Sequence, residues 1–84
     1  MAEAIVEDKV RRVMARIFRV PPESLGAESA RESIKLWDSV GQISLITGLE
    51  AEFGIRLTDQ QCMELRSFSS AMRIVQQSLS AKRE

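Results

Sequence analysis

The fold of this chain is decided by one stretch, DSVGQISLITGLEAEFG, at residues 38–54. Asp38 and Ser39 are residue types that favour the N-cap of a helix, because their side-chain oxygens accept hydrogen bonds from the unpaired N–H groups of the first turn. Gly54 stands where a helix can end on a left-handed residue, and Ile55 follows where it can fold back on the helix end as in a Schellman motif. We therefore expect a helix that begins at Asp38 and Ser39 and runs to about Phe53.

One side of this helix is expected to face the core. Its apolar members recur at helical spacing, with Glu50 as the one charged residue among them. They are Val40, Ile43, Ile46, Leu49 and Phe53.

A second helix is predicted before this stretch, over about residues 3–19. Apolar residues recur there at spacings of three and four and form one stripe. They are Val6, Val10, Val13, Met14, Ile17 and Phe18. Val20 followed by Pro21 and Pro22 ends the pattern, because proline lacks a backbone donor and restricts the residue before it. A polar connection then leads to Trp37, and ordered loops of that length are often functional or locally structured.

Two more helices are predicted after residue 54. Thr58 and Gln61 form a capping-box pattern in front of a short helix over about 59–65. Ser67 can cap a last helix, whose apolar residues again recur at helical spacing. They are Phe68, Ala71, Met72, Val75 and Leu79. The tail, residues 80–84, is expected to fray.

The predicted fold is all-α: a four-helix bundle with three main helices, a short third helix and a long first loop. No segment alternates between apolar and polar residues as a strand with turn residues around it would. With 84 residues, the chain is expected to form a single domain over 1–84, with an ordered core over about 4–79. We expect a monomer.

Composition excludes several classes of function. Twelve Lys and Arg balance twelve Asp and Glu, which argues against a nucleic-acid binder that depends on neutralising phosphates. The chain has no His, so it lacks the base of Ser-His-Asp and Cys-His catalysis and the commonest metal ligand. The lone Cys62 can form neither an internal disulfide nor a zinc site. It is interpreted as a small buried apolar residue.

The ends and the hydropathy of the chain predict a cytoplasmic protein. Glu3, Glu7 and Asp8 stand where a signal peptide needs positive charge. The longest uncharged stretch, 39–49, is shorter than the roughly 20 residues of a membrane-spanning helix. We expect no association with a membrane.

Two motifs resemble the acyl carrier protein family. The run Leu36-Trp37-Asp38-Ser39-Val40 is similar to the Asp-Ser tripeptide that opens the second helix of that family, and Leu49-Glu50-Ala51-Glu52-Phe53-Gly54-Ile55 to the run that closes it. A lone Asp-Ser pair has little specificity, whereas the two motifs at this separation have much more. The resemblance covers about residues 4–79 and is strongest over 36–57.

The resemblance implies a carrier and not an enzyme. Ser39 would be the residue to which a phosphopantetheinyl transferase attaches 4'-phosphopantetheine from coenzyme A, and Asp38 would contact a basic group on that transferase. The thiol of the arm would hold acyl groups as thioesters for an acyl-loading enzyme and for acyl-processing synthases or transferases. The position is suitable on physical grounds, because a serine in the first turn is accessible and the helix N-terminus favours an anion.

Partners are expected to dock beside Ser39. The predicted docking residues are Trp37, Val40, Gln42, Glu50 and Glu52. Trp37 has a second interpretation, as a side chain that closes the loop onto the bundle. Val40, Ile43, Ile46, Met63 and Leu65 are candidates for lining a cavity for an acyl tail, although ordinary packing predicts the same residues.

The lack of charge over 39–49 departs from the acidic second helix that is common among carriers of fatty acid synthesis. It favours a specialised carrier of polyketide, modified-lipid or other secondary pathways. Three alternatives remain: a peptidyl carrier, although the double glycine before the serine is missing; an unmodified helical interaction module; and a DNA-binding helix-turn-helix over residues 59–79.

Overall fold

The structure is a computed structural model that describes residues 3–83, and the side chains of residues 4–82. It contains four α-helices: α1 (Glu3–Phe18), α2 (Ser39–Phe53), α3 (Asp59–Glu64) and α4 (Phe68–Arg83). Two short 3-10 helices, η1 (Pro22–Ser24) and η2 (Arg31–Ser33), lie in the first connection. Among residues 3–83 there is no strand, only an isolated bridge between Ala30 and Ser67. The all-α prediction is confirmed.

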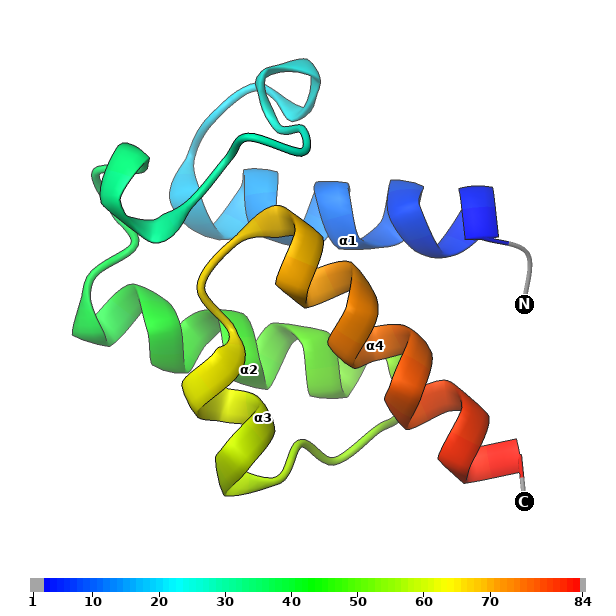
Figure 1. Cartoon of the computed structure of the whole chain (residues 1–84). Helices are drawn as coiled ribbons and strands as arrows, with labels where there is room; N and C mark the ends of the chain where they lie inside the picture. Colours follow the sequence, from blue (N-terminus) through cyan, green and yellow to red (C-terminus); the bar gives the residue numbers. More distant parts are fainter. Residues whose placement is uncertain (1–2, 84) are drawn as a thin grey trace.

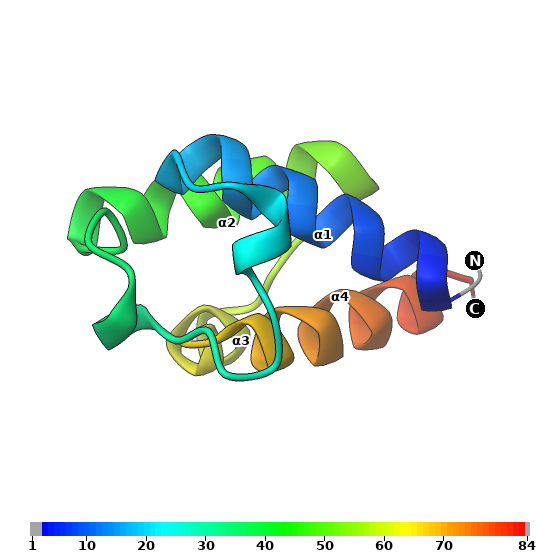
Figure 2. The same ribbon diagram turned by 90° about the horizontal axis from the view of Figure 1, so that it is seen from above.

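The three long helices pack around one core, and α1 contacts both α2 and α4 (Figures 1 and 2). The first turn of α1 and the last turn of α4 lie at the same end of the molecule. The short α3 lies in front of α2 in Figure 1 and next to the start of α4 in Figure 2. This arrangement leaves the first turn of α2 at the opposite end, next to the long connection.

The predicted caps are present at three helix ends. Gly54 is left-handed, with φ 62° and ψ 41°, and the N–H groups of Gly54 and Ile55 both donate to the carbonyl of Glu50, as in a Schellman motif. Thr58 and Gln61 form the capping box of α3, with distances of 3.1 and 3.0 Å between the side-chain oxygens and the backbone nitrogens. The hydroxyl of Ser67 accepts from the N–H of Ser70 at 3.0 Å and so caps α4.

Helix α1 ends in a C-terminal capping motif that was not predicted from the sequence. Arg19 adopts φ 57°, and the N–H of Val20 donates to the carbonyl of Ala15 at 3.2 Å. This is the hydrogen-bond pattern of a Schellman motif with arginine in the left-handed position. The helix therefore ends at Phe18, so Pro21 and Pro22 are not the residues that terminate it.

The long connection is fixed to the junction between α3 and α4. The N–H of Arg31 donates to the carbonyl of Arg66, and the N–H of Phe68 donates to the carbonyl of Ser29, both at 2.9 Å. Leu25 is buried and anchors the other half of the connection. The loop before Ser39 is thus ordered by tertiary contacts.

The core shows that the predicted apolar side of α2 is partly wrong. Val40 is 72% exposed and Ile43 is 65% exposed, whereas Leu45 is fully buried together with Leu49. Apolar residues lie all round this helix, so their spacing alone does not identify the buried side. Gly41 is also buried in this helix. A Cβ at this position would overlap the carbonyl oxygen of Leu36, so the position requires glycine.

The C-terminal boundary also needs correction. Helix α4 continues to Arg83, beyond the predicted end of the ordered core at residue 79. Fraying of the tail stays a prediction, and Glu84 lies outside the described residues.

Candidate functional site

Ser39 is the first residue of α2, and its side chain is exposed. Among residues 3–83, no side chain or backbone group forms a hydrogen bond with its hydroxyl. A hydroxyl in the first turn that is accessible and uncommitted can be reached by an external enzyme.

Asp38 is the N-cap of α2, as predicted. Its Oδ1 accepts from the N–H of Gly41 at 2.9 Å, and its carbonyl accepts from the N–H of Gln42 at 2.8 Å. The N–H groups of Ser39 and Val40 have no hydrogen-bond partner within the part of the chain that the structure describes. These two donors, together with the positive end of the helix dipole, favour an anion beside the Ser39 hydroxyl.

Trp37 is not available as a partner contact, so that prediction is wrong. Its side chain is only 2% exposed and stacks on Phe18, with 4.9 Å between ring centroids and 23° between ring planes. Its indole N–H donates to Oε1 of Gln42 at 2.6 Å. The second interpretation of Trp37, closure of the loop onto the bundle, agrees with this geometry.

The side-chain amide of Gln42 is used in hydrogen bonds within the protein, so it is not free for docking. Besides accepting from Trp37, its Nε2 donates to the carbonyls of Cys62 at 3.0 Å and Leu65 at 3.1 Å. No local sequence pattern indicates these bonds, since the acceptors are backbone carbonyls 20 and 23 residues away. Gln42 therefore ties the loop before Ser39 and the end of α3 to α2.

The remaining predicted docking residues have different surroundings. Glu50 is half-buried, and its carboxylate accepts from the N–H of Leu57 at 2.9 Å. Glu52 and Val40 are exposed, as docking would require. Docking at these residues stays a prediction.

The predicted acyl-tail lining does not form one enclosed set. Val40, Ile43 and Met63 are exposed at 72%, 65% and 70%, whereas Leu65 is fully buried and Ile46 is partly buried against the core. The exposed members cannot enclose a chain, because they face solvent.

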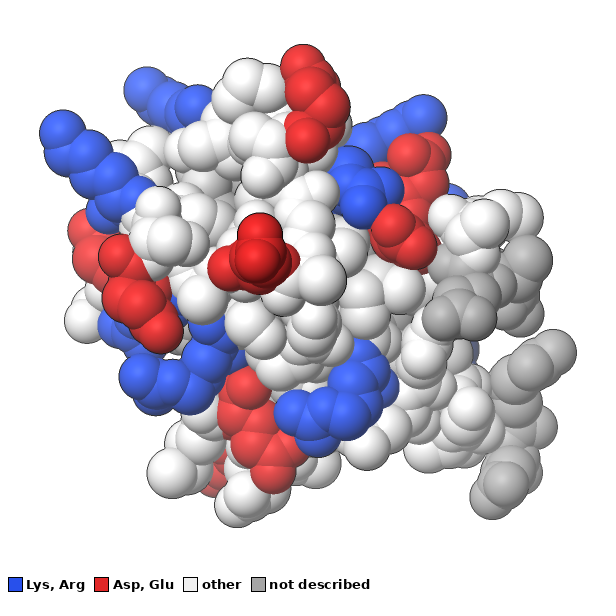
Figure 3. All heavy atoms as spheres, turned by 45° about the horizontal axis from the view of Figure 1, so that its top comes forward, with Lys and Arg blue, Asp and Glu red and all other residues white. Residues whose placement is uncertain are grey.

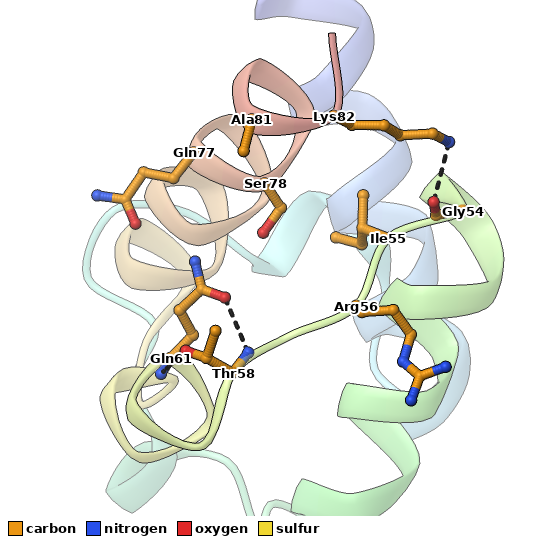
Figure 4. Close-up of a pocket in the computed structure, with 9 residues that line it drawn as sticks. All are labelled: Gly54, Ile55, Arg56, Thr58, Gln61, Gln77, Ser78, Ala81 and Lys82. Atoms are coloured by element: carbon orange, nitrogen blue, oxygen red, sulfur yellow. Dashed lines mark hydrogen bonds between the residues drawn. The ribbon is translucent and has the colours of Figure 1, made fainter. Parts of the chain in front are cut away.

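A groove of about 430 Å³ lies at the other end of α2 (Figure 4). Gln77, Ser78 and Ala81 of α4 form one wall, and Ile55, Thr58 and Gln61 form the other. Lys82 closes its rim by donating to the carbonyl of Gly54 at 2.9 Å. Because Gly54 and Ser39 are at opposite ends of a 15-residue helix, roughly 20 Å apart, this groove is separate from the Ser39 site.

Cys62 lies on α3 and is half-buried, not fully buried as predicted. Burial raises the pKa of its thiol, and the carboxylates of Glu50 and Asp59 raise it further. A raised thiol pKa disfavours the thiolate, which is the nucleophilic form.

Two further features bear on function. Within the described residues, no group of three or more Cys, Asp or Glu side chains is arranged to hold a metal ion. The helices of residues 3–83 also lack the combination of length and apolar character needed to cross a membrane.

Comparisons with known proteins agree with this geometry. The sequence matches the family described as "Phosphopantetheine attachment site" over residues 8–75. It is 25% identical to an acyl carrier protein of Thermosynechococcus vestitus over 81 residues, which cover 96% of this chain and 100% of that protein. The solution structure of a holo acyl carrier protein from Geobacter metallireducens has the same fold, with a TM-score of 0.80 and 22% identity over 92% of this chain and 88% of that one.

The chain therefore belongs to the phosphopantetheine-binding family of acyl carrier proteins. It is a carrier and not an enzyme, and its prosthetic group is covalently attached 4'-phosphopantetheine. The start of α2 fits such a group: it offers an exposed hydroxyl for a phosphodiester and two unpaired N–H groups beside it.

Proposed function

We propose that Ser39 carries the 4'-phosphopantetheine arm. The observation that supports this most directly is the exposed Ser39 hydroxyl at the N-terminus of α2, which, like the N–H groups of Ser39 and Val40 beside it, has no hydrogen-bond partner among residues 3–83. When bound, the arm supplies a terminal thiol that holds an acyl group as a thioester.

The residues of this chain position the attachment point and perform no bond-making on the cargo. Asp38 caps the first turn through its bond to Gly41, which stabilises the helix start that carries the exposed Ser39. The N–H groups of Ser39 and Val40 favour the negative charge of a phosphodiester by about 0.3 to 1 kcal/mol at an exposed site. Tethering raises the effective concentration of cargo at any enzyme that docks on the carrier.

We propose that the partners are a phosphopantetheinyl transferase, an acyl-loading enzyme and acyl-processing synthases or transferases. The absence of charged residues over 39–49 favours a specialised pathway, such as one for polyketides or modified lipids. Charges of both signs are interspersed on the face that includes the long connection (Figure 3). A uniformly charged partner would find no matching field there.

Incubation with coenzyme A and a promiscuous transferase tests the attachment. Intact-protein mass spectrometry should show one added phosphopantetheinyl group on the wild type and none on Ser39→Ala. Ser44→Ala is the matched control, because Ser44 is an exposed serine on the same helix and its loss should leave modification unchanged. An unmodified wild type, or a modified Ser39→Ala, would refute the proposal.

A further inference from the structure

The seam between α2 and residues 57–65 borders the proposed attachment residue. Residues 39, 43, 46 and 50 share one side of α2, because they are spaced three and four apart. Glu50 reaches the N–H of Leu57 from that side, and Ile46 is partly buried there. An acyl chain that entered the bundle from Ser39 would therefore have to part this seam.

Polar contacts hold the seam closed at both ends. At the Ser39 end, the Gln42 amide donates to the carbonyls of Cys62 and Leu65 at the C-terminus of α3, and the Cys62 carbonyl also accepts from the N–H of Leu65. At the far end, the Glu50 carboxylate accepts from the N–H of Leu57. Parting the seam would break the bonds of the Gln42 amide, of the Leu65 carbonyl and of the Leu57 N–H at a partly buried site, which is costly.

The Gln42 contact is further braced from the loop. Its Oε1 accepts from the Trp37 indole at 2.6 Å, and that ring is stacked on Phe18. Both the oxygen and the nitrogen of the amide are therefore engaged, so the side chain cannot rotate away without losing all three bonds.

The interior behind the seam is already filled. Leu45, Leu49, Leu65 and Ile74 are fully buried, and Trp37 is 2% exposed. Interiors pack at nearly crystalline density, so an inserted chain needs these side chains to move apart.

From these contacts we propose that the group carried at Ser39 stays outside the bundle, and that this carrier serves short or polar acyl groups. The inference rests on the proposed attachment at Ser39. Short or polar groups are compatible with solvent, whereas a long alkyl chain would keep its apolar surface in water. Gln42 is the positioning residue that keeps the seam shut.

Thermal unfolding of loaded forms tests this. The wild type, Gln42→Ala and Thr47→Ala are each loaded by a transferase from butyryl- and octanoyl-coenzyme A, and each product is checked by intact mass. Thr47→Ala is the matched control, because Thr47 is an exposed polar residue of the same helix and lies outside the predicted docking residues. We expect the two wild-type forms to differ in Tm by less than about 1 °C, and the two Thr47→Ala forms likewise.

Gln42→Ala should respond to chain length, with the octanoyl form melting about 4 °C or more above the butyryl form. A rise of that size in the wild type would overturn the inference. An equal Tm for the two Gln42→Ala forms would overturn the role of Gln42. If Gln42→Ala fails to fold, amide chemical shifts of the wild type decide: shifts of Leu45 and Leu65 that change between its butyryl and octanoyl forms would show entry of the chain.

The mass measurement separates this inference from the proposed function. A wild type that gains no mass refutes the attachment and the inference together. A loaded wild type that is stabilised by octanoyl refutes the inference alone.

Discussion

At the scale of single residues, Asp38 combines two roles that substitution can separate. Its carboxylate caps α2 through the N–H of Gly41, and its charge is the proposed contact for a basic group of the transferase. Asparagine keeps a side-chain acceptor and removes the charge, whereas alanine removes both.

Asp38→Ala is expected to lower the free energy of unfolding by about 1 kcal/mol, and Asp38→Asn by about 0.5 kcal/mol or less. Both should slow modification of Ser39 by the transferase, because both lack the charge. Urea unfolding gives the stabilities, and initial rates by intact mass give the modification. Equal destabilisation by the two variants would contradict the capping role, and wild-type modification of Asp38→Asn would contradict the charge contact.

Cys62 and the arm thiol are expected to differ in reactivity. Burial raises the pKa of Cys62 first, and the charges of Glu50 and Asp59 add to it. The thiolate is therefore populated only as pH rises through that raised pKa, so at about pH 8 Cys62 stays mostly a neutral thiol. We expect iodoacetamide to alkylate the arm thiol of the holo form well before Cys62. The alkylation rate of Cys62 should increase at higher pH, as more of its thiol is ionised.

Peptide mass spectrometry after timed alkylation measures the two rates, and Cys62→Ser identifies the signal of the arm. Alkylation of Cys62 at the rate of the arm at about pH 8 would show that its thiol is not protected.

At the scale of helices, α1 and α2 both end on a left-handed residue. Glycine suits that backbone geometry and arginine does not. Gly54 holds φ 62° without a Cβ, whereas Arg19 holds φ 57° with one. A left-handed residue other than glycine costs roughly 1 to 2 kcal/mol. Gly54→Val should therefore destabilise the protein by on the order of 1 kcal/mol or more, and Arg19→Gly should stabilise it by up to about 1 kcal/mol. Thermal melts of both variants check the signs, and a neutral Gly54→Val would contradict this account of the α2 end.

These ends also show what the sequence could predict. Caps are local, so Asp38, Gly54, Thr58 and Ser67 identified the starts or ends of α2, α3 and α4. The buried side of α2 is set by which neighbours pack on it, so spacing placed Val40 and Ile43 inside although they are exposed. The contacts of Gln42 with the end of α3 connect residues more than 19 positions apart, and no local pattern encodes them.

At the scale of the whole molecule, charge balance should determine how partners find the carrier. The chain has twelve cations and twelve anions, and the described surface mixes both signs on the face in Figure 3. The exposed side of α2 near Ser39 offers Val40 and Ile43 and no charge before Glu50. Long-range steering needs a surface field of one sign, so encounter with partners should depend on short-range apolar contact.

The salt dependence of modification tests this balance. With saturating coenzyme A, the KM of the transferase for the wild-type carrier should change less than about twofold between about 50 mM and about 0.5 M sodium chloride, a range over which the Debye length shortens several-fold. The double variant Ser44→Glu, Thr47→Glu places two charges on exposed positions of α2 and should make KM change with salt. A tenfold salt effect on the wild type would instead mean that charges outside residues 39–49 attract the partner, because no residue over 39–49 carries one.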